Sequence, residues 1–470
     1  MTTGEFTLSS VRNRLLTGSA WVFGAKIGTL ALGLVLSGLI ARLLSVPEFG
    51  AYLMTQTLVV VGSTLAKLGL ERATVRHAAS SLGTGEPGGA RDAIRIGLGW
   101  GAIGGAGVAL ILSFGVGRWF FGDVLGSPLV VSVIPIAAGW LFAVALQSLC
   151  VESFRGLSRF GMASILDHLA IDVVTAIVLG GVFLSGRHAS LDAVVGISAS
   201  VVAVVLVVTG ALLLKQVREL QGPGHVARTD MFRVARPLLV TNLGIYLLGS
   251  GVDLWVLSAF EPDNIVSLYG SASRLVVLVA TPLIIFSGVI PPIVAELHAQ
   301  GRTSQLERAL RAGATLAGLP ALGILAVFLL FGPSVLETVY GPDYRDAATY
   351  LAILSTGRVL AVWAGSCGVA LMMTGHQRAM MAITLVSGSI SIAGGLFAAP
   401  RFGAIGVAVT TSTAQVLQNL LQLILVRRRL GIWTTIQFSP RALIGFFTGK
   451  AEKEAARIAA EALVPDDDQS

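Results

Sequence analysis

The chain has 470 residues, of which 54% are hydrophobic and only 13% are charged. Because soluble proteins usually carry about twice that charged fraction, these figures exclude a disordered chain, a disulfide scaffold and a typical cytosolic enzyme. They predict instead a polytopic membrane protein. The net charge of +7 is expected from Lys and Arg held on the cytoplasmic side of a membrane, and it gives no reason to expect nucleic acid as a partner.

Apolar stretches of membrane length recur along the whole chain. A bilayer core about 30 Å thick requires roughly 20 apolar residues per helix. The sequence therefore predicts an all-α fold with about twelve transmembrane helices. The expected spans are residues 15–40, 50–69, 96–116, 128–152, 162–185, 193–214, 237–258, 265–292, 312–331, 348–373, 379–399 and 404–426.

The distribution of basic residues predicts the orientation of these spans. Most of the 33 Lys and Arg fall in both tails and the even-numbered loops. Because cytoplasmic loops collect Lys and Arg, both termini are expected in the cytoplasm. The predicted outer loops are short and hold five of these residues, namely Arg42, Arg118, Arg187, Arg345 and Arg401. Loops this short leave no room for an extracytoplasmic catalytic domain.

The second half of the sequence repeats features of the first. Residues 196–220 and 406–430 each run from a Gly into an apolar helix with a basic end, and shorter matches occur in the same order. Six helices per half give both halves one orientation, so we expect two parallel six-helix lobes around a central cavity that alternates its access. The expected parts are an N-terminal lobe (1–214), a cytoplasmic linker (215–236), a C-terminal lobe (237–430) and a tail with a surface helix (431–470).

Three cations lie about ten residues inside predicted spans, namely Lys26, Arg274 and Arg358. At 1.5 Å per residue each is about 15 Å from a surface, and an ionisable group at that depth is expected to face a cavity or a partner. Cations from both lobes suggest a cavity built for an anion. The alternative is that each is paired with a buried acid, for which Asp172 and Asp253 are the candidates.

Two further polar sets allow more than one interpretation. His168 and Asp172 share a helix face, so they are either a proton-responsive pair or a satisfied contact within one lobe, with Asp167 expected to point elsewhere. Gln415 and Asn419 belong to a polar stripe that could meet sugar hydroxyls or join helices. No nucleotide-binding loop, metal-ligand spacing or catalytic set occurs in the sequence, so we expect neither an enzyme nor a cofactor or metal.

The segment 19–79 resembles the start of the bacterial polysaccharide and O-antigen repeat-unit flippases, within the multidrug/oligosaccharidyl-lipid/polysaccharide superfamily. The resemblance rests on a turn of the form ARLL…P-E-FG-Y, followed by a helix ending in G-L-x-x-A-x-x-R. It covers roughly residues 12–430 at the level of the fold. The matching positions are Ala41, Arg42, Leu43, Leu44, Pro47, Glu48, Phe49, Gly50 and Tyr52, then Gly69, Leu70, Ala73 and Arg76.

The resemblance implies a function in cell-surface polysaccharide and lipopolysaccharide biosynthesis. The chain would move a polyprenyl-diphosphate-linked oligosaccharide from the cytoplasmic to the outer leaflet of the bacterial inner membrane. Its candidate partners would be this lipid, the membrane lipids, and the polymerase and glycosyltransferases of the same pathway. Related peptidoglycan-precursor flippases use cations in helices 1 and 8, the helices that hold Lys26 and Arg274 here.

Two other functions fit parts of the sequence. A multidrug or organic-cation antiporter on the same fold would need acids at the cavity centre, whereas the first helix carries Lys26 and no acid. A membrane glycosyltransferase, polymerase or ligase acting on the same lipid-linked sugars would need an acidic base and a large outer loop. A non-transporting assembly factor has no specific support.

Overall fold

The computed structural model describes residues 28–186, 188–249 and 251–437, and every regular element within them is a helix. The fold is therefore all-α, as the sequence predicts. Lys26 and the surface helix expected in the tail lie outside the described residues.

Eight helices of the described residues are long and apolar enough to cross a membrane, or nine if one bent pair counts as a single span. The predicted number of about twelve is therefore not confirmed. Two predicted spans are merged in α16, which contains a break at Gly403, and the predicted seventh span is split between α9 and α10. The described part of the first helix, Gly28–Leu43, is apolar but shorter than the roughly 20 residues needed to cross a membrane.

The other elements have the following bounds: α2 Val46–Ala66, α3 Leu70–Gly83, α4 Pro87–Ile111, η1 Leu112–Val116, η2 Trp119–Val124, α5 Pro128–Gly156, α6 Phe160–Ser164, η3 Ile165–Leu169, α7 Ala170–Leu184, α8 Leu191–Glu219, α9 Arg228–Gly249, α10 Val252–Ser258, α11 Asp263–Val289, α12 Pro291–Ala299, α13 Thr303–Tyr340, η4 Pro342–Ala347, α14 Ala348–Trp363, α15 Cys367–Met373 and α16 Gln377–Leu430.

The chain forms two compact units. Unit 1 comprises residues 1–268 with 339–341, and unit 2 comprises residues 269–338 with 342–470. This division does not coincide with the predicted lobes, because α9, α10 and the first residues of α11 group with the N-terminal helices. The division into lobes at 1–214 and 237–430, which would move against each other during transport, therefore stays a prediction.

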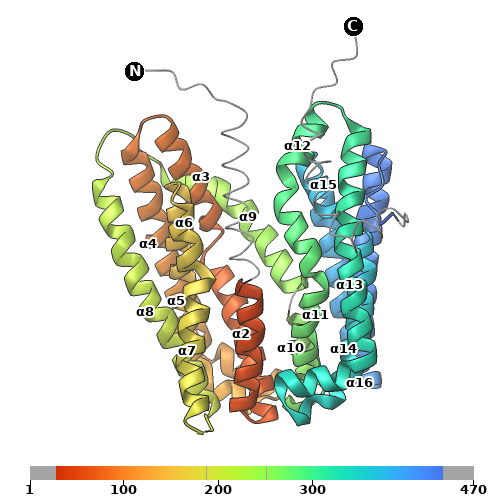
Figure 1. Cartoon of the computed structure of the whole chain (residues 1–470). Helices are drawn as coiled ribbons and strands as arrows, with labels where there is room; N and C mark the ends of the chain where they lie inside the picture. Colours follow the sequence, from red (N-terminus) through yellow and green to blue (C-terminus); the bar gives the residue numbers. More distant parts are fainter. Residues whose placement is uncertain (1–27, 187, 250, 438–470) are drawn as a thin grey trace. The chain divides into compact units, whose positions relative to one another are not determined.

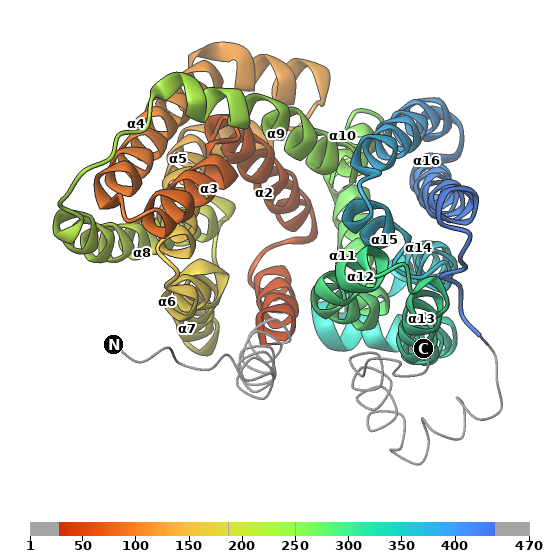
Figure 2. The ribbon, with the colours of Figure 1, turned by 90° about the horizontal axis from the view of Figure 1, so that it is seen from above.

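Unit 1 is built around α5, which packs against α2, α3, α4 and α8 (Figure 2). The helix α2 also packs against α4 and α9. Its first turn is closed by a capping box, because the backbone N–H of Ser45 donates to the Glu48 carboxylate and the Ser45 side chain caps the helix in return. Glycine at position 104 lets α4 approach the backbone of α2 at Ala66, where an added Cβ would collide with the carbonyl oxygen. Such close approach through small residues is how helices pack in lipid.

Unit 2 contains α12 to α16 and most of α11 (Figure 1). Two contacts show that α11 and α14 run side by side in the same direction. The rings of Tyr269 and Tyr350 lie 6.1 Å apart, and further along, near the end of α11 and just beyond the end of α14, the hydroxyls of Ser287 and Ser366 are 2.9 Å apart. α14 also packs on α16, where the Ser412 hydroxyl donates to the Ile353 carbonyl at 3.3 Å.

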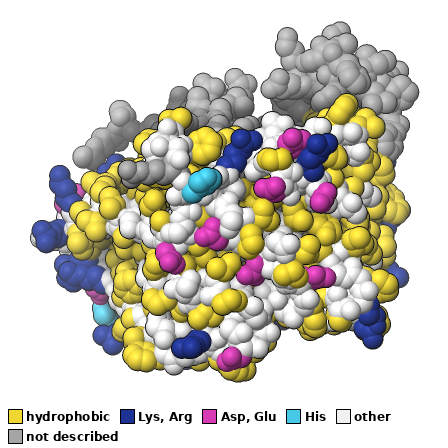
Figure 3. Space-filling model, turned by 90° about the horizontal axis from the view of Figure 1, so that it is seen from below, with side chains coloured by type: hydrophobic (Ala, Val, Ile, Leu, Met, Phe, Trp, Pro, Cys, Tyr) yellow, Lys and Arg dark blue, Asp and Glu magenta, His cyan; other side chains and the backbone are white. Residues whose placement is uncertain are grey.

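Exposed arginines are concentrated at one end of the helices in each unit. Exposed Arg72, Arg76 and Arg95 lie on α3 and the first half of α4, and exposed Arg427, Arg428 and Arg429 close α16. We call these ends of the two units their basic ends. At the opposite helix ends Asp123, Asp192 and Asp343 are exposed together with Arg118, Arg345 and Arg401, and Figure 3 shows acidic and basic side chains scattered among hydrophobic ones.

Candidate functional site

Arg358 is a half-buried cation inside unit 2. It is the eleventh residue of α14, and its Nε is buried without a hydrogen-bond partner. Within the described part of the chain, no carboxylate lies within ion-pair distance of its guanidinium. The neighbouring turn holds Ser355, whose hydroxyl is also buried without a partner. A buried guanidinium edge without an acid can accept an anionic ligand, since Arg binds phosphate through parallel hydrogen bonds.

The polar stripe of α16 lies beside this part of α14. Gly357 and Ser412 are in direct contact, because an added Cβ at Gly357 would overlap the Ser412 side chain. Gln415 lies one turn beyond Ser412 on the same helix face, so the helix pair places Arg358 and Gln415 on adjoining turns. Both Gln415 and Asn419 are half-buried, and the Asn419 amide donates to the Gln415 carbonyl at 2.9 Å.

Arg274 lies on α11 in the same unit. It follows Tyr269 by five residues, whereas Arg358 follows Tyr350, the residue that Tyr269 contacts, by eight. At 1.5 Å per residue the two arginines therefore differ in depth by about 5 Å. The Arg274 side chain is exposed and takes part in a polar or charged interaction, so its pairing with an acid remains an open alternative.

The structure arranges His168 and Asp172 differently from the predicted continuous helix. The helix α6–η3–α7 is interrupted at Asp167, whose ψ of −129° is non-helical. His168 Nε2 lies 3.7 Å from the Asp167 carboxylate, so Asp167 does not point elsewhere as expected. His168 itself is exposed, and in the described residues it forms no ion pair with Asp172.

Two side chains of α5 bond to the chain at this break and stabilise it. The buried Gln147 amide donates to the Leu166 carbonyl at 2.7 Å and to the Thr209 hydroxyl at 3.1 Å. Arg155, two turns further along α5, pairs with the Asp167 carboxylate at 2.8 Å and also with Glu152. A carbonyl freed by a break at membrane depth needs such a donor. The sequence prediction missed these roles, because nothing in the pattern around Asp167 marks an interruption.

Asp253 belongs to unit 1, where it occupies the first turn of α10 and accepts a hydrogen bond from the Leu254 backbone at 3.1 Å. It takes part in a further interaction, and its short helix packs on α2, where the Trp255 indole donates to the Met54 carbonyl. Among the described residues, no cluster of His, Cys, Asp and Glu could hold a metal ion.

Comparison with known proteins places the chain in a family. The family described as polysaccharide biosynthesis protein matches residues 15–298, which is more than half of the chain. The chain belongs to this polysaccharide biosynthesis protein family. No curated protein sequence matches it significantly.

Solved structures share the fold of this polysaccharide biosynthesis protein. An inward-facing multidrug resistance transporter of the MATE family and MOP superfamily has a TM-score of 0.73 at 17% identity, covering 86% of this chain and 94% of its own. The lipid II flippase MurJ in an inward closed conformation has a TM-score of 0.70 at 13% identity, and the match covers 94% of this chain and 90% of the MurJ chain. A MOP superfamily transporter from Pyrococcus furiosus, whose binding pocket is described as having reverse polarity, has a TM-score of 0.57 at 15% identity, covering 89% and 95%.

The motif residues of the polysaccharide biosynthesis protein are packing positions of unit 1. At Gly50 an added Cβ would collide with the Asp263 carbonyl, and at Gly69 it would collide with the Ala235 carbonyl. Arg42 donates to the Val339 carbonyl at 3.2 Å, and the Phe49 ring lies 6.0 Å from Tyr340. The motif therefore joins α2, the helix before it and the turn after it to three later segments of the chain.

Proposed function

We propose that this protein is a flippase that moves a polyprenyl-diphosphate-linked oligosaccharide between membrane leaflets during polysaccharide biosynthesis. The observation that carries the proposal is the guanidinium of Arg358, which is half-buried in a membrane-length segment and has no acidic partner among the described residues. Family membership supports the pathway, and a lipid II flippase has the same fold.

The chemistry of the substrate explains why such a cation is needed. A diphosphate carries roughly two negative charges, and its passage through a medium of low dielectric would be prohibitive without positive partners. Arg358 would bind the diphosphate, with Arg274 at similar depth and Lys26 as further cations. Gln415 and Asn419 would meet the sugar hydroxyls, and His168, Asp172 and Asp253 would contribute to coupling.

The same proposal includes the path of transport and its setting. The substrate would enter from the cytoplasmic leaflet of the bacterial inner membrane, with both termini of the protein in the cytoplasm. The excess of Lys and Arg in both tails and the even-numbered loops supports this orientation, because Lys and Arg gather on the cytoplasmic side. The lobes 1–214 and 237–430 would rock against each other, and glycosyltransferases would supply the substrate that a polymerase consumes.

Substitution of Arg358 tests the proposal directly. In a strain that lacks its own flippase, the full-length protein should restore surface polysaccharide, whereas Arg358→Gln should reduce it at least about tenfold, because one charge-assisted contact is worth more than 1.4 kcal/mol. Arg358→Lys should restore part of the activity. The control is Arg378→Gln, an exposed cation in the first turn of α16.

Membrane insertion and expression of each variant are measured alongside. Normal surface polysaccharide with Arg358→Gln, at matched expression, would reject the role assigned to this cation. A second candidate, export of organic cations, is favoured by the similarity to a multidrug transporter fold. Transport of a lipophilic cation by the purified protein in liposomes would support it over the flippase.

A further inference from the structure

A short segment that follows α16 is packed into the interior of unit 2. Residues 432–437 form no helix or strand after α16 ends, with Ile432 only 2% exposed and Thr434 fully buried. We call this segment, Ile432–Gln437, the strap. Trp433 between them is exposed, and the Arg427 guanidinium lies 5.2 Å from its ring centre.

The strap lies on the break between α14 and α15. These two helices are bent by 44° across Ala364, Gly365 and Ser366. In a continuous helix the carbonyls of residues 363 and 364 would accept from N–H groups four residues later. Here the Trp363 carbonyl accepts from the Ile436 backbone at 3.2 Å, and the Ala364 carbonyl accepts from the Thr434 hydroxyl at 2.7 Å and from the Cys367 thiol at 3.1 Å.

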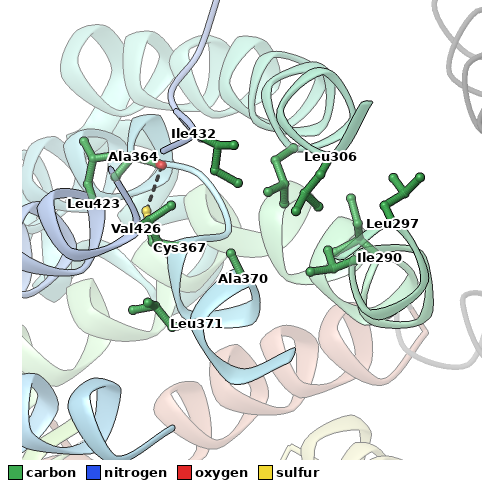
Figure 4. Close-up of a cluster of buried hydrophobic side chains, with 12 residues drawn as sticks. Ile290, Leu297, Leu306, Ala364, Cys367, Ala370, Leu371, Leu423, Val426 and Ile432 are labelled. Carbon is green, nitrogen blue, oxygen red and sulfur yellow. Dashed lines mark hydrogen bonds between the residues drawn. The ribbon is translucent and has the colours of Figure 1, made fainter. Parts of the chain in front are cut away.

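Small residues on both sides of the break leave the space that the strap fills. Gly365 has a φ of +77°, and an added Cβ would collide with the Thr434 carbonyl oxygen. On the other side, Gly318 of α13 contacts the Ile436 side chain, and the Thr315 hydroxyl accepts from the Gln437 backbone at 3.1 Å. The strap therefore joins α13 to the bent helix pair, and Figure 4 shows Ile432 in the same cluster as Ala364, Cys367 and Leu306.

We propose that the strap is a releasable latch that selects between a bent and a straight state of α14–α15. The same two carbonyls have two alternative sets of donors, the strap in the bent state and the helix itself in the straight one. With the straight state as a second discrete arrangement, α14–α15 would meet what a conformational switch requires. Because α14 carries Arg358, docking of the strap also sets the position of that cation.

Cys367 reports whether the strap is docked. Its thiol is fully buried and lies 2.9 Å from the Thr434 hydroxyl. In the background Cys150→Ala, the rate at which N-ethylmaleimide modifies Cys367 is measured in the purified full chain. Thr434→Val should raise this rate about tenfold, as expected for the loss of one hydrogen bond, whereas Thr434→Ser should leave it within twofold.

Two truncations provide a matched pair. The chain ending at Gln437 keeps the strap and should keep Cys367 protected, whereas the chain ending at Gly431 should expose it. In a Cys367→Ala background, continued protection of the buried Cys150 shows that each variant is folded. Equal protection of Cys367 in both truncated, folded proteins would overturn the proposal.

Release is tested by tethering. Thr434→Cys places a second thiol beside Cys367, and mild oxidation should form a disulfide that holds the strap in place. We expect surface polysaccharide export to stop on oxidation and to return with dithiothreitol. Full export with the disulfide complete would overturn the latch, whereas absence of export in the unsubstituted protein would count against the proposed function and leave the thiol measurements interpretable.

Discussion

The break at Asp167 in unit 1 and the break at Gly365 in unit 2 interrupt helices of the same kind, but different partners stabilise them. In unit 1 the partners are Gln147 and Arg155, side chains of the helix that precedes the break in sequence. In unit 2 the partner is a backbone segment about seventy residues later in the chain, which supplies the Thr434 hydroxyl and the Ile436 N–H.

This difference in partners is the reason why we propose a change of state at the second break and not at the first. Gln147 and Arg155 are part of a continuous 29-residue helix, so they cannot leave the first break without disturbing the packing of α5. The strap, by contrast, follows the end of α16 and belongs to no helix, so its release in our proposal unfolds no helix. One of the shorter matches of the repeat is between residues 154–162 and 372–380, so α5 corresponds to α14–α15 and the two halves have their interruptions in different helices.

Substitution of Gly365 should give the largest effect on stability. In Gly365→Ala the new Cβ meets both a strained φ of +77° and the Thr434 carbonyl, so we expect a loss of about 3 kcal/mol. Gly375→Ala is the matched control, because its φ is +84° with open space around it, and it should cost only about 1 kcal/mol. Thermal unfolding of the purified proteins measures both, and equal losses would show that the strap does not constrain Gly365.

The sequence was sufficient to predict where the long helices lie, but it was insufficient to predict the two breaks. Hydropathy locates α2, α5 and α8, because lipid requires long apolar helices whatever their neighbours are. The interaction of His168 with Asp167 was missed, since residue spacing was interpreted on an uninterrupted helix. The strap was missed because its partners, at Gly318 and Gly365, are far away in sequence, and only tertiary packing brings them together.

Removal of the side-chain amide of Gln147 should lower the stability of the protein at the first break. Gln147→Leu keeps the side-chain volume but leaves the Leu166 carbonyl without its donor, which should cost about 2 kcal/mol. Gln216→Leu is the control, because among the described residues the Gln216 amide bonds only to the Met162 sulfur, at 3.7 Å, and its loss should be within about 0.5 kcal/mol. A Gln147→Leu protein as stable as the control would mean that the break needs no donor from α5.

The ion pair at the first break should contribute least, because it is partly exposed to solvent. The side chains of Arg155 and Asp167 are 34% and 30% exposed, so Arg155→Ala should cost about 1 kcal/mol. Arg233→Ala removes a more exposed pair, with Asp230 at 3.4 Å, and should have no measurable effect. If Arg155 acts through Asp167, adding Asp167→Asn to Arg155→Ala should recover part of the loss, because the uncompensated carboxylate is then removed. Additive losses in that double variant would assign the effect to Glu152 instead, and the break would then depend on Gln147 alone.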